Sequence, residues 1–137
     1  MIKYEKPKII ISKCLEFDHC RYDGNIIYNQ IVKKMKKYVD FSPVCPEIEI
    51  GMGIPREPIQ IVENQGRRVL YQPSTKKDYS NSMNAFSEKY LYSIKSVDGF
   101  LLKSKSPSCG IISTKIFHDC KKNNDSIKVG EGMFTSK

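Results

Sequence analysis

An apolar run that stops at a tight turn is the feature that most restricts how this chain can fold. Residues 99–102 (Gly-Phe-Leu-Leu) lead towards the turn Ser-Pro-Ser-Cys-Gly at 106–110. This pattern predicts a buried strand that ends in a loop, with the thiol of Cys109 just past the strand. Cys14 and Cys45 follow apolar segments in the same way. We therefore predict that the three thiols meet at one site.

The segments around the first two thiols predict a parallel pair of strands. Three consecutive isoleucines within 8–12 are typical of a strand that is buried on both faces. Residues 26–38 then place apolar side chains at helical spacing, with lysines between them, and Asn25 is a candidate N-cap. A short strand over 39–44 follows. A strand, a helix and a second strand in this order indicate a right-handed crossover between parallel strands.

The rest of the chain predicts further elements of the same domain. In order, we expect an extended and irregular stretch over 46–58, a hairpin of strands over 59–62 and 69–71, a helix over 78–96, a third parallel strand over 99–103, a fourth strand over 115–117 and a polar turn over 121–126. Together they predict an α/β fold, a Rossmann-like three-layer domain with a mainly parallel sheet. In such sheets the ligand site lies at the carboxyl ends of the strands, which all three cysteines follow.

Length and cysteine usage restrict the class of protein further. A chain of 137 residues is one domain of common size. The N-terminus is charged and lacks the apolar core of a signal peptide, so we expect a cytoplasmic protein whose thiols stay reduced. The odd count of five cysteines also argues against a disulfide framework. Metal or cluster ligation, catalysis and simple burial all remain open.

The basic charge bears on possible partners. The formal net charge of +8 attracts anions, including RNA. However, the lysines are scattered, and no arginine-rich stripe with interleaved aromatic residues is present. We therefore favour a solvated basic surface over a dedicated nucleic-acid interface. No apolar run approaches the ~20 residues that cross a membrane, so we expect no membrane partner. We further expect a monomer or a homodimer.

The spacing of the cysteines separates some kinds of metal site from others. Cys14, Cys45 and Cys109 are far apart in sequence and form no Cys-x-x-Cys pair, which argues against zinc fingers and ribbons. Three thiolates without a fourth would suit an iron–sulfur cluster with one iron left open. Small buried hydrophobic cysteines are an equally good interpretation of the spacing. For Cys20 and Cys120, burial or incidental exposure is favoured over ligation.

Three polar groups near these thiols have both a functional and a structural interpretation. Glu47 could act as a general acid or base beside Cys45, or form a salt bridge with Arg56. Arg56 itself could bind substrate, although an internal ion pair is modestly favoured. Ser106 and Ser108 could donate hydrogen bonds to a substrate or simply form the turn.

Several short motifs together resemble those of one known family. They are Ile-Ser-Lys-Cys-Leu at 11–15, Cys-Arg-Tyr-Asp-Gly at 20–24, Pro-Val-Cys-Pro-Glu at 43–47, Gly-Ile-Pro-Arg-Glu at 53–57 and Lys-Ser-Pro-Ser-Cys-Gly at 105–110. In this order they resemble the thiouracil desulfidase (TudS-like) family, long catalogued as a domain of unknown function. A Gly-x-Gly-x-x-Thr segment of that family is present at 130–135. The resemblance extends over nearly the whole chain and implies a single desulfidase domain over 1–137.

The resemblance implies a cofactor and a reaction. An oxygen-sensitive [4Fe-4S] cluster would be held by Cys14, Cys45 and Cys109, leaving one iron open. That iron would accept sulfur from a thiolated pyrimidine base, a small-molecule partner. Water would replace the sulfur at the ring carbon without redox chemistry, so that thiouracil gives uracil and hydrosulfide.

The resemblance also implies roles for the polar residues of the same motifs. Glu47 would be the catalytic acid and base that handles the protons of water and ring. Ser108 would position the base, and we predict Ser106 and Arg56 as further substrate-binding residues. An alternative function is a non-enzymatic iron–sulfur or thiol sensor, or an RNA-binding protein.

Overall fold

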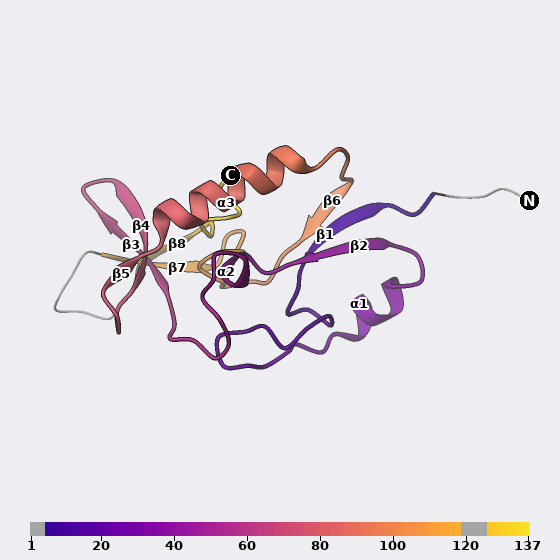
Figure 1. Cartoon of the computed structure of the whole chain (residues 1–137), viewed down its shortest axis with the longest axis horizontal. Coiled ribbons are helices and arrows are strands. Elements are labelled where there is room, and N and C mark those ends of the chain that lie inside the picture. Colours follow the sequence, from indigo (N-terminus) through magenta and orange to yellow (C-terminus); the bar gives the residue numbers. More distant parts are fainter. Residues whose placement is uncertain (1–4, 119–125) are drawn as a thin grey trace, which may run out of the picture.

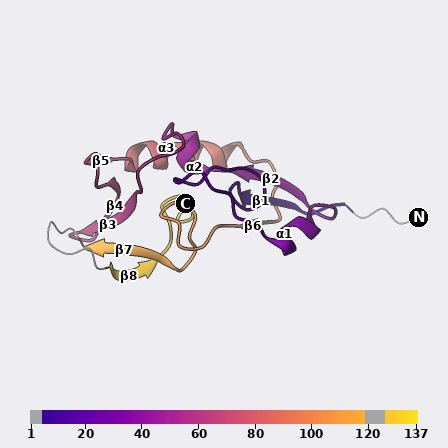
Figure 2. The same cartoon turned by 90° about the horizontal axis from the view of Figure 1, so that it is seen from below.

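The computed structural model describes residues 5–118 and 126–137, which form two β-sheets with three helices. The longest helix extends from one sheet towards the other (Figures 1 and 2). In chain order the elements are β1 (Lys8–Ser12), α1 (Gln30–Met35), β2 (Asp40–Val44), α2 (Pro46–Glu49), β3 (Gln60–Asn64), β4 (Arg67–Gln72), β5 (Lys77–Asp78), α3 (Ser80–Ser93), β6 (Gly99–Leu101), β7 (Thr114–His118) and β8 (Ser126–Gly130). Within these residues, every helix falls short of the length and apolar character needed to cross a membrane.

The smaller sheet has three parallel strands in the order β2-β1-β6, as the sequence predicts for this part of the chain. The isoleucines of the central strand β1 explain its position, since Ile10 and Ile11 are both buried and β-branched side chains pack well between neighbouring strands. Ile10 is opposite Ser42 on one side and Phe100 on the other. All three strands therefore end at the same edge of this sheet.

Helix α1 crosses from β1 to β2, but it is shorter than predicted. Its N-cap is Asn29, not Asn25: the Asn29 side chain accepts hydrogen bonds from the backbone N–H groups of Ile31 and Val32. Residues just before the cap pair with the Cys14 loop instead, where the Ile27 N–H donates to the Cys14 carbonyl. That pairing keeps the segment extended. Val32 is the buried residue of the helix, whereas Ile31 is exposed, so part of the predicted apolar stripe faces solvent.

The larger sheet has five strands in the order β5-β4-β3-β7-β8. Strands β3 and β4 form the predicted antiparallel hairpin, with Ile61 opposite Leu70. Strand β7 adds to β3 in parallel, with Ile116 opposite Ile61, and β8 pairs antiparallel with β7. Ile61, Leu70 and Ile116 are fully buried against α3 and the C-terminal segment. One core therefore belongs to this sheet, and a second core lies around β1.

The mixed α/β class is confirmed, but the single mainly parallel sheet is not, nor is a Rossmann-like three-layer arrangement. The fourth predicted strand, β7, joins the hairpin instead of the parallel sheet, because its buried Ile116 packs into the core of the larger sheet. Strand β8 was not predicted. The stretch 46–58 is not wholly irregular, since α2 begins at Pro46, which suits the first position of a helix. Most of the predicted turn over 121–126 lies outside the described residues.

Candidate active site

The ends of the three parallel strands place three cysteines around one cavity. Cys14 lies two residues past β1, Cys45 directly follows β2, and Cys109 lies in the turn beyond β6. Because these strands are parallel neighbours, their carboxyl ends meet at one edge of the sheet. The cavity there has a volume of about 280 Å³. Seven residues singled out in the sequence line it: Cys14, Cys45, Glu47, Arg56, Ser106, Ser108 and Cys109.

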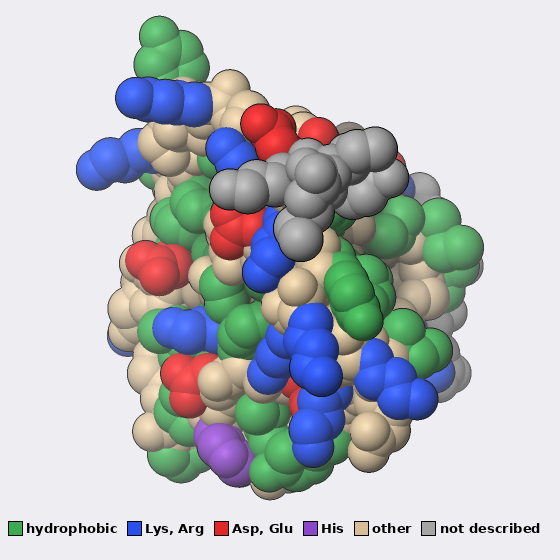
Figure 3. All heavy atoms as spheres, turned by 90° about the vertical axis from the view of Figure 1, so that its right-hand side faces the viewer, with side chains coloured by type: hydrophobic (Ala, Val, Ile, Leu, Met, Phe, Trp, Pro, Cys, Tyr) green, Lys and Arg blue, Asp and Glu red, His purple; other side chains and the backbone are tan. Residues whose placement is uncertain are grey.

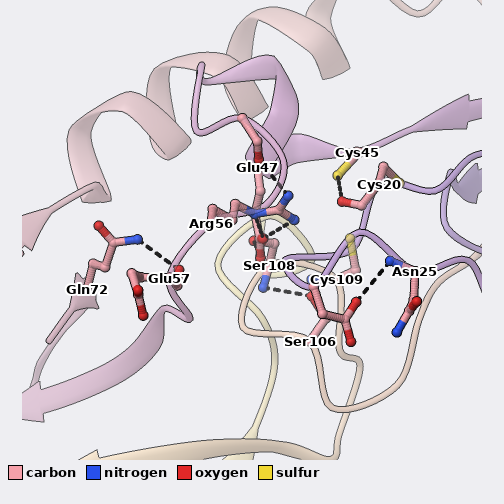
Figure 4. A network of polar contacts seen from close by, with 12 residues as sticks. Cys20, Asn25, Cys45, Glu47, Arg56, Glu57, Gln72, Ser106, Ser108 and Cys109 are labelled. Carbon is pink, nitrogen blue, oxygen red and sulfur yellow. Dashed lines mark hydrogen bonds and ion pairs between the residues drawn. The ribbon is translucent and has the colours of Figure 1, made fainter. Parts of the chain in front are cut away.

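A carboxylate, a guanidinium and a hydroxyl form a connected network in this cavity (Figure 4). Both Nε and Nη2 of Arg56 donate to Oε2 of Glu47, at 2.7 and 2.5 Å. The Ser108 hydroxyl donates to the other carboxylate oxygen, Oε1, at 3.2 Å. The side chains of Glu47 and Arg56 are only 12% and 5% exposed. The carboxylate is thus held by Arg56 at one oxygen and by Ser108 at the other.

Local structure explains how Glu47 comes to lie there. Cys45 is the N-cap of α2 and Pro46 its first residue, so Glu47 lies in the first turn of the helix. A carboxylate is favoured at that position by the helix dipole. Arg56 is fixed from the other side, because its backbone N–H donates to the Tyr22 carbonyl at 2.8 Å and Nη1 to the Gly53 carbonyl at 3.0 Å. The Pro-Val-Cys-Pro-Glu motif therefore positions a thiol and a carboxylate together.

The Ser106 side chain shapes the turn that contains Cys109. Its Oγ accepts hydrogen bonds from the backbone N–H groups of Ser108 and Cys109, at 3.2 and 3.1 Å. Its carbonyl accepts from the Thr114 hydroxyl at 2.7 Å. The turn-forming interpretation of Ser106 is therefore what the structure shows, and its hydroxyl proton is left over for a further acceptor.

The C-terminal segment packs against the same turn. The backbone N–H of Met133 donates to the Pro107 carbonyl and that of Phe134 to the Ser108 carbonyl, at 2.7 and 2.9 Å. Gly132 lies so close that a Cβ there would be 2.5 Å from the Ser108 carbonyl group. The Gly-x-Gly-x-x-Thr segment thus acts as a backbone support for Ser108 and Cys109. In the sequence this segment was identified only through the family resemblance.

Cys20 is the residue of this site that the sequence interpretation missed. It was assigned to burial or incidental exposure, yet it lines the cavity with the other thiols and is 1% exposed. Hydrogen bonding from the Cys20 thiol lowers the pKa of Cys14 and of Cys45, and the same two bonds raise the pKa of Cys20. The signal that could have found it is the Cys-Arg-Tyr-Asp-Gly motif itself. Cys120 lies outside the described residues.

Burial has the largest effect on the pKa of the Cys109 thiol. Desolvation raises the pKa of Cys109 to about 12, and a hydrogen bond from the Ser12 side chain opposes that rise. Ser12 is the last residue of β1 and is buried. Its Oγ also accepts a hydrogen bond from the Lys103 N–H at 2.8 Å. A positive partner such as a metal would favour the thiolate of Cys109, which burial alone disfavours.

The donor set of this cavity fits an iron–sulfur cluster better than one metal ion. Over residues 5–118 and 126–137, no three His, Cys, Asp or Glu side chains gather closely enough to hold a single ion. The cysteines at 14, 20, 45 and 109 are free thiols. Thiolates are the usual ligands of iron–sulfur clusters. In a cuboidal cluster each thiolate binds a different iron, so thiols spread around one cavity suit it.

The site therefore combines free thiols, which can bind a metal as thiolates, with a buried carboxylate and hydroxyl. An α/β protein with such a site is suited to chemistry at a thiolate-bound metal. The chain belongs to the 2-thiouracil desulfurase family, whose model matches residues 9–137. This confirms the resemblance found in the sequence motifs. The family is one of enzymes that remove sulfur from thiouracil.

Two further proteins are similar to this chain. The first is the uncharacterized protein YbbK of Bacillus subtilis strain 168, which is 30% identical over 111 residues, covering 74% of this chain and 72% of YbbK. The second is a solved structure, the [4Fe-4S]-dependent thiouracil desulfidase TudS. It superimposes with a TM-score of 0.69 at 28% identity, covering 96% of this chain and 83% of TudS.

Proposed function

We propose that this protein removes sulfur from a thiolated pyrimidine base, using a [4Fe-4S] cluster. The main observation in support of this proposal is that three free thiols and the Glu47–Ser108 pair line one cavity. The family match and the similarity to a [4Fe-4S]-dependent desulfidase support the same chemistry. We place this activity in the cytoplasm, where the thiols stay reduced. The balanced reaction is thiouracil plus water giving uracil, hydrosulfide and a proton, with no change of redox state.

Cys14, Cys45 and Cys109 are the proposed ligands of the cluster. Each follows a different strand of the parallel sheet, so the rigid sheet edge fixes their separation. When bound, the cluster would supply an open iron that takes up the sulfur of the substrate. These thiols share a cavity of about 280 Å³ with Glu47, and we propose that the base binds in this cavity beside the cluster.

Glu47 is the proposed general acid and base. Oxygen replaces sulfur at the ring carbon, so a proton must leave the attacking water and a proton must reach the ring or the departing sulfur. Glu47 is buried, and two nitrogens of Arg56 donate to its Oε2. Oε1 faces Ser108 and remains the oxygen that can take up or return a proton. The third guanidinium nitrogen of Arg56, Nη1, donates to the Gly53 carbonyl. We therefore propose that Arg56 positions Glu47 and does not bind substrate.

Ser108 and Ser106 are the proposed substrate contacts. The Ser108 hydroxyl lies on the wall of the cavity between Glu47 and the Cys109 turn (Figure 4). From there it can donate to a ring carbonyl or relay a proton to Glu47. Ser106 has a hydroxyl proton to offer to the same ligand, because its Oγ otherwise acts as an acceptor.

A sensor that binds RNA is the weaker candidate. On the face shown in Figure 3, the Lys and Arg side chains lie in several groups, with acidic and hydrophobic side chains between some of them. A phosphate-binding surface would need these charges to follow one continuous path. On this face the basic charge is therefore better explained as a solvated surface.

Anaerobic reconstitution followed by a hydrosulfide assay tests the proposal. We expect brown protein with about four irons and four sulfides per chain, and hydrosulfide release from 2-thiouracil or 4-thiouracil. The Cys109→Ala variant, prepared in parallel, should release none. Protein that stays colourless and free of iron under these conditions would overturn the proposal. A sensor would bind the cluster and show no turnover with either base.

A further inference from the structure

Cys20 is a fourth thiol that the proposed ligand set does not use. It is buried with Cys14 in the core around β1, and Cys45 packs against the same core. The Cys45 Sγ lies 3.8 Å from the Cys20 carbonyl oxygen, to which it can donate. Figure 4 shows the two residues side by side at the edge of the cavity. Cys20 therefore lines the cavity next to two of the three proposed ligands.

The Cys20 side chain is buried in one cluster with Cys14, Cys45 packs against that cluster, and all three residues line the same cavity. Hydrogen bonding between Cys20 and these two thiols lowers the pKa of both, in agreement with this packing. A thiol has one S–H donor, whereas a ligating thiolate is an acceptor. Cys20 can thus donate its single S–H hydrogen to one of these two sulfurs, or share it between them, without becoming a ligand itself. Groups that hydrogen-bond to metal ligands fix the orientation of those ligands and tune the metal.

The backbone around Cys20 keeps this thiol in place. The Arg21 N–H donates to the Asn25 carbonyl at 3.2 Å, and the Gly24 N–H donates back to the Arg21 carbonyl at 2.8 Å. Asp23 closes the turn by accepting from the Asn25 N–H at 3.0 Å. Ile27 then pairs with the Cys14 loop. The Cys-Arg-Tyr-Asp-Gly motif is therefore a rigid turn that presents the Cys20 thiol to its neighbours.

We propose that Cys20 is a positioning residue that donates a hydrogen bond to the cluster-ligating sulfurs of Cys14 and Cys45. Its donor orients these two thiolates, slows loss of the cluster and raises the reduction potential of the cluster, because hydrogen bonds to the sulfurs stabilise the more negative reduced state. This inference rests on the proposed cluster. It assigns a role to a residue that neither the family motif nor the ligand set explains.

The test compares Cys20→Ala, which removes the donor, with Cys20→Ser, which keeps a hydroxyl donor. Ser87→Ala is the matched control, since it removes one small buried donor from α3 in the other core. All proteins are reconstituted anaerobically, and circular dichroism checks their folding. The readouts are iron and sulfide content, the rate at which a chelator removes iron, and the reduction potential from a spectroscopically monitored titration.

We expect Cys20→Ala to take up the cluster but to lose it to the chelator about 10–100-fold faster than wild type, the cost typical of removing such a partner. Its reduction potential should fall. Cys20→Ser should recover most of both properties, and Ser87→Ala should match wild type. If Cys20→Ala does not fold, Cys20→Val, which fills the space without a donor, replaces it.

Three results would count against the inference. Wild type that binds no iron overturns the proposed function and this role together. A wild type that loads and turns over, with Cys20→Ala equal to it in chelator rate and potential, overturns only the role of Cys20. Failure of both Cys20→Ala and Cys20→Ser to load, although both fold, would make Cys20 a ligand and not a donor.

Discussion

The two sheets of this protein differ in what their buried residues are used for. The core of the five-stranded sheet contains aliphatic and aromatic side chains, such as Leu70, Phe134 and Met83 of α3. The core around β1 contains Cys14 and Cys20 among its aliphatic residues, with Cys45 packed against them. Both cores exclude water, but only the second opens onto the cavity. A buried thiol can pack as a small hydrophobe, and we propose that position after a strand end makes Cys14 and Cys45 ligands instead.

The two regions nevertheless meet, and one place where they do so is the turn 106–110. By chain order this turn follows β6 of the parallel sheet. Its carbonyls, however, accept hydrogen bonds from the C-terminal segment, whose Met133 and Phe134 belong to the core of the larger sheet. The parallel sheet thus places Cys14 and Cys45, and the larger sheet helps to place Cys109. We therefore expect substitutions at the cavity to affect the cluster and the activity, and substitutions in the core of the larger sheet to affect mainly the stability.

The largest expected effect comes from Cys109→Ala. Without this thiolate we expect no stable cluster and no measurable hydrosulfide release, because two thiolates cannot hold an Fe–S cluster that normally has three or four protein ligands. Iron analysis and the hydrosulfide assay measure both.

Ile116→Val, in the core of the larger sheet, is the control for this substitution. It should lower the free energy of unfolding by about 0.5–1.5 kcal/mol and leave the iron content per folded chain unchanged. Full activity of Cys109→Ala, or loss of iron in the folded Ile116→Val protein, would remove the distinction between the two regions.

Glu47→Gln should have the next largest effect. The substitution keeps the size of the side chain and removes the proton-accepting carboxylate, so turnover should fall about 10²–10⁴-fold while the cluster is retained. Hydrosulfide release rates and the visible spectrum of the cluster measure these outcomes separately.

Glu63→Gln is the matched control, because Glu63 also pairs with an arginine, Arg68, at 3.1 Å, but on strand β3 of the larger sheet. That pair is partly exposed, so its loss should cost at most about 1 kcal/mol of stability and no activity. Equal rates for Glu47→Gln and wild type would show that the carboxylate is structural only.

Gly132→Ala tests the contact between the two regions. The added Cβ would lie 2.5 Å from the Ser108 carbonyl group, and backbone atoms cannot move aside cheaply. We expect a loss of about 1–3 kcal/mol in the free energy of unfolding, measured by denaturant titration, together with weaker retention of the cluster.

Gly99→Ala on β6 is the control, since its Cβ would meet only the flexible end of Ile9 at 3.3 Å. A Gly132→Ala protein as stable as Gly99→Ala, with full cluster retention, would mean that the C-terminal segment does not support the Cys109 turn.

The sequence could predict much of the parallel sheet because its signals are local. The isoleucine run, the lysine-spaced helix and the short strand before Cys45 each identify an element without reference to the rest of the chain. The choice of sheet for β7 is not local: Ile116 would suit either sheet, and only its packing against Leu70 and Met83 decides. The helix start was wrong for a similar reason, since Asn29 caps α1 only because Ile27 pairs with the Cys14 loop.

The residues of the candidate site also divide into those that local sequence signals identify and those whose positions depend on distant contacts. The three thiols, Glu47 and the two serines stand out because each lies in a segment that follows a predicted strand. Cys20 does not follow a strand, and its place beside Cys14 and Cys45 depends on how the loop 13–29 closes on itself. The support of the turn by Gly132 depends on a contact between distant segments, for which spacing along the chain provides no signal.

The smallest expected effect is that of Asn29→Ala. This substitution tests whether the crossover helix α1, as well as the strand ends, contributes to the positions of the thiols. Asn29 Oδ1 accepts from the N–H groups of Ile31 and Val32 at 3.0 and 3.1 Å, so the substitution leaves two helix donors without this acceptor. The expected cost is ~1 kcal/mol of the free energy of unfolding, measured by denaturant titration. Cluster content and hydrosulfide release per folded chain should not change, because α1 lies outside the cavity lining. Asn29→Asp, which keeps the cap, should restore the stability. A folded Asn29→Ala protein that loses its cluster would show that the crossover helix, and not only the strand ends, fixes the positions of the thiols.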